Sequence, residues 1–511
     1  MSIILIKNGF VINPWVGSKA DVLISDGKID GIFENSSGSF DETHLNKIGA
    51  KIIDAAGCLV MPGCIDAHLH LGLPYRNEKA IDDFEIGSKA ALSSGITSLI
   101  DYTVHEKGEN LLKTIERRRK DADGNSYVDY ALHCCISDFS DKIAKDFGKV
   151  IDYGINSFKL FMAYPRWLAD DAMILKIMEE AVKYDAVVEV HAESYSAINH
   201  YLAKYDTPTM KKKLGIMALA MSRPDFTEAE AVSRLMFWAG ETGCRVHVVH
   251  VSTAEAAYII AEAKTKGIRV TAETCPQYLF ISEEKLHGKN GHYNSCCPPL
   301  RQAHNCEGLW QALNSGVFDM VTTDSCAFNK RQKDLWNGDF TKIANGLYGI
   351  ETLMPLIFNF VSNPEEYDEL IHGMTESGCN CDNHNHKIKA AENVNLKKKS
   401  TITEKEKNII KKLGLYQKIA GLLAYGPAKI FGMAHRKGHI TAGNDADIII
   451  IDPFKAEKIN NKNMVVDCGY SPFNGLNASN GLLYTISGGK IAYASGKFIK
   501  NEKNGKFIER F

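Results

Sequence analysis

Short apolar segments alternate with helical stretches along the chain from about Met61 onward. A parallel strand covered on both faces has a continuous apolar run, and Val246–Val251 shows this pattern. The alternation predicts βαβ units, and eight of them predict an α/β fold, a TIM (β/α)8 barrel. A doubly wound sheet is disfavoured because no glycine-rich phosphate loop follows an early strand. The eight predicted strands are Gly63–His68, Thr97–Thr103, Tyr130–Ile136, Ser157–Ala163, Ala186–His191, Val246–Val251, Arg269–Glu273 and Phe318–Asp324.

The two ends of the chain have a different texture, with short β-rich segments separated by Gly, Asn and Asp. They predict one small β-sandwich domain formed from both chain ends. Its N-terminal part is expected at residues 1–60, the barrel at 61–435, and its C-terminal part with a tail at 436–511. The predicted strands are Ile3–Lys7, Phe10–Ile12, Asp21–Ser25, Lys51–Ile53, Asp445–Ile451, Thr485–Ser487 and Lys490–Ala494.

Residues 375–405 are predicted to form a polar insertion in the barrel, because they are rich in Asn, Lys and His. The tract Cys379–His386 within it contains cysteines and histidines, but it lacks the ligand spacing of a zinc finger. We therefore interpret this tract as a solvated loop.

The charge balance limits the partners. Sixty basic and 62 acidic residues give a formal net charge of −2, which favours neither nucleic acid nor an anionic membrane. A small neutral substrate fits this balance. The 13 scattered cysteines are no secreted disulfide framework, and neither a signal-peptide core nor a membrane-length apolar stretch is present. We expect a cytoplasmic protein with no membrane partner.

Polar side chains gather at the carboxyl ends of the predicted strands, where TIM barrels carry their active sites. His68 and His70 share one face of the first strand, and two neutral imidazoles on one face can bind a divalent metal. This pair alone is a weak signal, since strand histidines are commonly packed core residues. Three further residues at the ends of later strands strengthen it, namely His191, His250 and Asp324. His247 is expected to face the helices and to be structural.

Lys159 is the residue that is hardest to explain by packing alone. It lies in Ser157–Phe161 between aromatic and aliphatic neighbours, where an ammonium without a partner is costly. A desolvated lysine has a lowered pKa and becomes a nucleophilic amine that can take up carbon dioxide. The resulting carbamate would be an anionic bridge between two metals. The alternative is an ordinary ion pair with a buried acid such as Asp324.

Several longer motifs resemble the amidohydrolase superfamily and, within it, the dihydropyrimidinase/hydantoinase branch. The resemblance covers nearly the whole chain except about Thr375–Lys405. The motifs that carry it are Pro62–His70, Ser157–Tyr164, Glu273–Leu279, Pro298–Arg301, Ile343–Gly346 with Gly349–Glu351, Lys437–Ile440 and Gly443–Asp447.

This resemblance implies a set of roles. His68, His70 and Asp324 would bind one zinc ion, His191 and His250 the other, and carbamylated Lys159 would bridge the two. A metal-bound hydroxide would be the nucleophile, with Asp324 as general base and acid. Tyr164 would stabilise the oxyanion, and the cyclic amide would be held largely through the backbone, at positions matching Cys297 and Asn345. Asp66 and Glu193 would orient ligands rather than bind metal.

The chain departs from the branch at a few positions near the expected site. Cys297 replaces a frequent Ser, and Ser325 follows Asp324 where His or Asn is usual. Thr352 and Leu353 follow Glu351 in place of an Asp-Arg pair, so the anchoring of that loop is expected to differ. Two aromatic residues, Tyr75 and Trp167, either line the substituent pocket or pack within their loops.

The expected activity is ring opening of a 5,6-dihydropyrimidine or hydantoin to an N-carbamoyl amino acid. The alternatives are an allantoinase or another specialised cyclic-amide hydrolase, and a non-enzymatic dihydropyrimidinase-like scaffold. No arginine stands out in the matched motifs, which disfavours a substrate that carries a carboxylate. The resemblance also implies a homotetramer or a homodimer.

Overall fold

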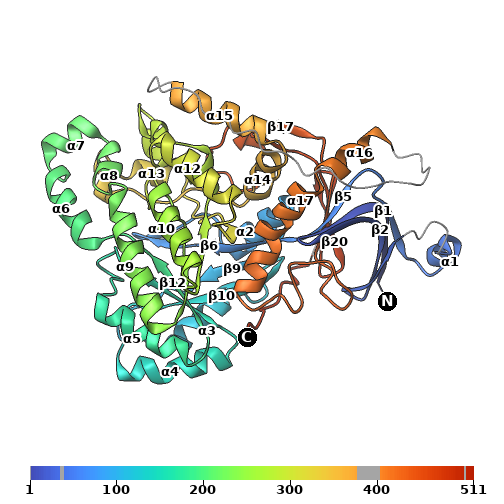
Figure 1. The fold of residues 1–511 in the computed structure, drawn as a ribbon, viewed down its shortest axis with the longest axis horizontal. Helices are drawn as coiled ribbons and strands as arrows, with labels where there is room; N and C mark the ends of the chain where they lie inside the picture. The colour runs from blue at the N-terminus through green and yellow to red at the C-terminus, as the bar shows by residue number, and fades with distance from the viewer. Residues whose placement is uncertain (1, 35–39, 377–402, 500–501) are drawn as a thin grey trace.

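The computed structural model describes residues 2–34, 40–376, 403–499 and 502–511. Two parts lie side by side, an α/β barrel and a β domain (Figure 1). The tract Cys379–His386 and nearly all of the predicted insertion lie outside the described residues, so that prediction stays open.

The eight predicted strands all form, and they pair in parallel in chain order. The barrel closes where the last strand meets the first: the Asp324 amide donates to the carbonyl of His68 at 2.8 Å, and the His70 amide to that of Ser325 at 2.8 Å. The TIM-barrel prediction is confirmed. Its strands are β6 (Cys64–Leu69), β9 (Ile96–Tyr102), β10 (Asp129–Cys135), β11 (Ser157–Phe161), β12 (Val187–His191), β13 (Arg245–Val248), β14 (Val270–Thr274) and β15 (Met320–Val321).

Helices follow the strands and cover the outside of the barrel (Figure 1). Many begin at an N-cap residue whose side chain accepts a hydrogen bond from a backbone amide of the first turn. Examples are Asp83, Ser140, Asp170 and Thr253. No described helix is long and apolar enough to cross a membrane. The principal helices are α2 (Phe84–Ser93), α3 (Leu111–Ala122), α4 (Asp141–Asp152), α5 (Asp171–Val182), α6 (Tyr195–Tyr205), α7 (Pro208–Leu214), α8 (Met217–Met221), α9 (Phe226–Thr242), α10 (Ala254–Thr265), α12 (Ala303–Asn314), α14 (Leu353–Ser362) and α15 (Pro364–Glu376).

Both chain ends contribute to one nine-stranded sheet, as predicted. In Figure 1 the blue strands β1 and β2 lie on the same side of the molecule as the red C-terminal strand β20, and β19, β16 and β5 lie between β20 and β1 in the sheet order. The two ends are joined where Val60 pairs with Ile450. The strands are β1 (Ile3–Asn13), β2 (Val16–Ser25), β3 (Lys28–Glu34), β4 (Lys51–Asp54), β5 (Leu59–Pro62), β16 (Ile448–Ile451), β19 (Leu482–Ser487), β20 (Lys490–Ala494) and β21 (Lys497–Phe498). The proposed domain boundaries near residues 60 and 436 remain predictions.

The barrel interior is apolar at its base and polar above it. Phe431, which follows α18 (Gly426–Ile430), packs with Ile65, Ile100 and Val187 at the base. Arg510 also reaches this region from the C-terminal tail: its guanidinium is fully buried and donates to the carbonyl of Leu132 and, at 3.0 Å, to Ser157 Oγ. The base therefore supports the charged side chains above it.

Candidate metal centre

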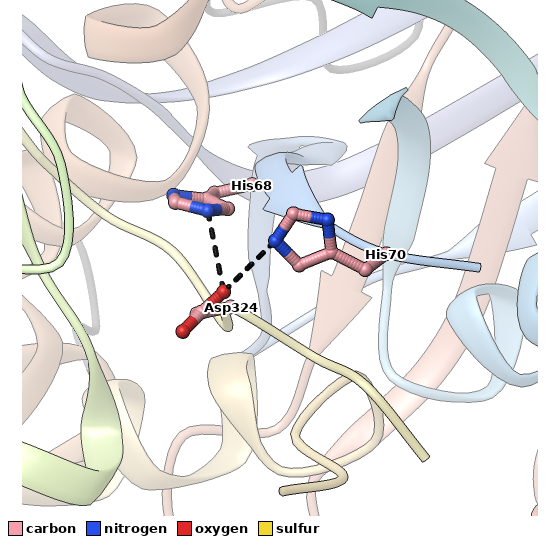
Figure 2. A group of neighbouring side chains, drawn as sticks. All are labelled: His68, His70 and Asp324. Carbon is pink, nitrogen blue, oxygen red and sulfur yellow. Dashed lines mark ion pairs between the residues drawn. The ribbon is translucent and has the colours of Figure 1, made fainter. Parts of the chain in front are cut away.

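Two histidines of β6 and its extension converge on one carboxylate (Figure 2). The Nε2 atoms of His68 and His70 each lie 3.2 Å from Asp324 Oδ1. His68 Nδ1 is hydrogen-bonded to Glu273, which leaves Nε2 as the ring nitrogen that faces the carboxylate. That buried Nε2 has no hydrogen-bond partner among the described residues. Two lone-pair nitrogens and a carboxylate oxygen form a donor set that suits a divalent cation.

A second pair of histidines faces this group from the ends of β12 and β13. His191 Nδ1 lies 2.8 Å from His250 Nε2. The other ring nitrogen of His191 lies 2.7 Å from Glu193 Oε2, and Glu193 in turn accepts a hydrogen bond from Arg223. The carboxylate therefore fixes the His191 ring with Nδ1 as a free ligand atom.

Lys159 lies between the two groups and is buried. Its Nζ lies 4.8 Å from the Tyr102 ring centroid and 5.5 Å from that of Phe161. No carboxylate of the described residues lies within ion-pair distance of this ammonium, so the simple pairing with Asp324 is absent. Burial lowers its pKa, against the opposing effect of Glu189, Glu273 and Asp324. A lysine in these surroundings can be neutral and nucleophilic.

Two of the six converging residues have an unusual backbone conformation. His250 has φ +40° and Asp324 has φ +48°, in the left-handed region that side chains other than glycine rarely adopt. His250 lies two residues beyond the end of β13 and Asp324 three residues beyond the end of β15, so the turn after each strand directs the side chain into the barrel mouth. Such strain is typical of functional sites.

Glu273, on β14, is the main supporting residue that the sequence analysis missed as a site residue. Its carboxylate contacts the rings of His68 and His247, and it accepts a hydrogen bond from the backbone amide of His250 at 3.2 Å. The contacts with His68 and His247 hold the pKa of Glu273 well below its usual range, although burial alone would raise it. Its position at the end of the seventh strand was the available signal.

The predicted orientation of His247 was wrong. Its side chain is buried inside the barrel, 3.2 Å from Glu273 Oε2 and 5.5 Å from the Phe431 ring centroid. Strand β13 ends at Val248, and the backbone turns at His250. The two-residue alternation therefore does not extend from His247 to His250, and both side chains point inward.

A cavity of about 160 Å³ opens over the converging histidines. Tyr164, Cys297 and Asn345, the predicted substrate contacts, all contribute to its wall, with Phe161, Cys326 and Gly346. The Tyr164 ring lies 4.9 Å from the His191 ring, and its hydroxyl has a pKa raised well above the usual value because of burial. Asn345 Oδ1 is buried without a hydrogen-bond partner among the described residues, so it can accept from a ligand.

The two aromatic residues of uncertain role pack outside the cavity wall. Trp167 contacts Phe161 and Tyr164, which do line it, with ring centroids 5.7 and 6.3 Å apart. The hydroxyl of Tyr75 donates a hydrogen bond to the carbonyl of Lys342 at 2.5 Å. The packing alternative is the one that the structure supports.

Glu351 and the altered positions near it are held by hydrogen bonds within the chain. Its carboxylate accepts from the backbone amides of Val465 and Val466 and from the hydroxyl of Tyr348. Thr352 Oγ1 donates to the carbonyl of Gly349 at 3.0 Å. Ser325 Oγ accepts from the Gly349 amide at 3.2 Å. These contacts tie the loop to the barrel mouth.

The comparisons with known proteins agree with this architecture. The amidohydrolase family model matches residues 59–392 and 416–492. D-hydantoinase of Geobacillus stearothermophilus is 33% identical, covering 99% of this chain and 96% of its own length. Rat dihydropyrimidinase is 31% identical, covering 99% and 88%. The structure of D-hydantoinase from a Bacillus species superimposes with a TM-score of 0.84 at 31% identity, covering 99% of each chain. The chain therefore belongs to the amidohydrolase family, and it is a hydrolase similar to hydantoinases and dihydropyrimidinases along its whole length.

Proposed function

We propose that this protein opens the ring of a cyclic amide, a 5,6-dihydropyrimidine or a hydantoin, by zinc-dependent hydrolysis to an N-carbamoyl amino acid. Its whole-length similarity to hydantoinases and dihydropyrimidinases supports the substrate class. The observation that carries the proposal is the convergence of one ligand set at one cavity, namely His68, His70, Lys159, His191, His250 and Asp324.

The donor set fits two divalent cations. The facing nitrogens of His191 and His250 would hold one, and His68, His70 and Asp324 the other, with carbamylated Lys159 between them. Bound there, two zinc ions would make a water molecule acidic enough to attack an amide carbon near neutral pH.

The chain's own residues would carry the remaining steps. Asp324 stands at the centre of the histidines, where its carboxylate can accept the proton of the attacking water and deliver it to the leaving ring nitrogen. Its pKa is held well below the usual range by His68 and His70 despite burial, so the carboxylate is ionised. Tyr164, protonated because of its raised pKa, would donate to the developing oxyanion.

The cavity wall would hold the ring through the main chain around Cys297 and Asn345. A backbone contact does not depend on a side-chain hydroxyl, so Cys297 can stand where relatives often have serine. A homotetramer, or a homodimer, in the cytoplasm is part of this proposal.

The proposal is tested with zinc- and bicarbonate-supplemented protein offered dihydrouracil, hydantoin, phenylhydantoin and allantoin. Ring opening of dihydrouracil or a hydantoin, measured by loss of the cyclic amide and appearance of the N-carbamoyl product, would support it. Turnover of allantoin alone would assign an allantoinase instead. No turnover of any of the four by the metal-loaded protein would contradict an enzymatic role.

A further inference from the structure

Lys333 carries a further buried ammonium, outside the metal centre. It lies on α13 (Lys330–Asp334) and is fully buried. Its Nζ donates to the carbonyl of Ser295 at 2.7 Å and to Ser295 Oγ at 2.9 Å. No carboxylate within the described ranges forms an ion pair with it. Burial lowers its pKa to about 7. An interior ammonium is costly, so a specific use is expected.

Ser295, its partner, joins two segments of the cavity wall. The Ser295 carbonyl accepts two hydrogen bonds, one from Lys333 Nζ and one from the Gly346 amide at 3.1 Å. The Ser295 hydroxyl lies 3.5 Å from the carbonyl of Ala344. Ala344 and Gly346 flank Asn345, and Ser295 lies two residues before Cys297. One serine therefore links the main chain at Asn345 to the main chain at Cys297.

The Gly346 backbone also lies close against Cys326. A Cβ at Gly346 would lie 2.7 Å from Cys326 Cβ and 2.8 Å from the Cys326 carbonyl oxygen. Its φ of +152° is also one that other residues rarely adopt. This segment therefore contacts both Cys326 and the carbonyl of Ser295, and Gly346 lies on the cavity wall.

We propose that Lys333 is a positioning residue for the cyclic-amide ring, a role that rests on the proposed function. Lys333 does not line the cavity itself. It acts through Ser295, fixing both oxygen atoms of that residue and so the spacing between the Asn345 and Cys297 segments. Because the binding geometry of a ring held by main-chain groups depends on their spacing, small displacements weaken binding strongly.

The test is the variant Lys333→Met, which keeps the length and removes the donor. Main-chain contacts hold the ring equally in the ground and transition states, so their loss raises KM more than it lowers kcat. We expect KM for the ring substrate to rise about tenfold and kcat to change less than about threefold. Metal content should stay equal to that of the unmodified protein. Lys330→Met, at an exposed lysine of the same helix, is the matched control and should change neither constant.

Ser295→Ala provides a second variant, which removes one acceptor of Lys333 and keeps the carbonyl. It should raise KM by a smaller factor than Lys333→Met, and it decides the question if Lys333→Met fails to fold. Unchanged KM in a folded Lys333→Met protein, or in Ser295→Ala where only that variant folds, would overturn the positioning role. A loss of metal that accounts for the whole defect would also overturn it. These outcomes leave the proposed function intact, whereas its own failure is seen as absence of turnover in the unmodified protein.

Discussion

His191 Nδ1 and His250 Nε2 face each other across 2.8 Å, although 59 residues separate them in the sequence. Both rings are buried, and burial lowers the pKa of each, with their mutual proximity adding to the effect at His250. Two neutral imidazoles with their ligand nitrogens directed at one point form half of a metal centre. The other half, His68 and His70, points at the same cavity from β6.

The contact of Glu193 with His191 predicts a role in metal affinity. Glu193→Gln keeps the size of the side chain but weakens the charge-assisted contact to the ring and leaves Arg223 without a carboxylate partner. We expect the affinity of the second metal to fall by about 10–100-fold. Zinc titration against a competing chelator measures it. Glu230→Gln, at an acid of α9 that forms an ion pair with Arg234, is the control and should bind zinc normally. Equal affinity in both variants would rule out the orienting role.

The placement of Tyr164 predicts a defect in the chemical step alone. Tyr164→Phe keeps the ring that packs against His191 and removes the hydroxyl donor to the oxyanion. We expect kcat to fall by about 10²–10³-fold with little change in KM or in metal content. Steady-state kinetics with metal analysis checks this, with Tyr258→Phe at an exposed helix position as the control. A rise in KM with full kcat would assign Tyr164 to binding instead.

The buried histidines predict acid sensitivity of the chelated protein. The pKa is lowered at His70, His191 and His250, and to about 4 at His133, in each case chiefly by burial. Below a pH of about 6.5 these histidines are protonated in the unfolded chain but stay neutral in the folded protein. The unfolded state therefore binds more protons, and the free energy of unfolding falls as the pH falls.

His68 behaves differently, because Glu273 and Asp324 raise its pKa to about 9 against the effects of burial and Lys159. Its contribution to stability is complete below about pH 6.5 and is lost as pH rises through 9, so it does not offset the acid effect. Urea unfolding at pH 6.5 and pH 5 should show a loss of up to about 1.4 kcal/mol per pH unit for each such histidine. Stability that is equal at the two pH values would contradict this account.

The buried guanidinium of Arg510 predicts a large contribution of the C-terminal tail to stability. Arg510→Met would remove donors to the Leu132 carbonyl and Ser157 Oγ beneath the metal centre. Hydrogen bonds from a charged group contribute about 1.5–3 kcal/mol each, and we expect a loss of about 3 kcal/mol in urea unfolding. Glu509→Gln, at the exposed neighbouring residue, should lose less than about 0.5 kcal/mol. An equal effect of both variants would show that the guanidinium contacts contribute little.

The barrel strands could be predicted from the sequence because each contains buried apolar residues in a short segment, and these segments alternate with helical stretches. β9, for example, is buried at all seven of its residues. The histidines and Asp324 stood out because they lie at the carboxyl ends of such segments, and Lys159 because it lies in the middle of one. The local sequence pattern therefore indicates where the strands and the candidate ligands lie. The resemblance to a known family supplied the expected role of each ligand.

The supporting residues could not be predicted in this way. Glu273 contacts His68 across 205 residues, and Lys333 contacts Ser295 across 38, so no local pattern reports either pair. The inward direction of His247 also depends on a backbone turn at His250 that strand alternation does not describe. Long-range contacts and a left-handed φ are properties of the folded chain.

The central claim is a two-metal centre bridged by Lys159, and the most direct test is metal stoichiometry measured together with the native mass of the intact chain. In zinc- and bicarbonate-supplemented protein, we predict two zinc ions per chain and a carbon dioxide adduct on this lysine, preserved by mild native mass analysis. Lys159→Ala should bind fewer than two ions and lose activity, whereas Lys176→Ala, at an exposed helix position, should behave like the unmodified protein. A Lys159→Ala protein that still bound two zinc ions with full activity would contradict the account.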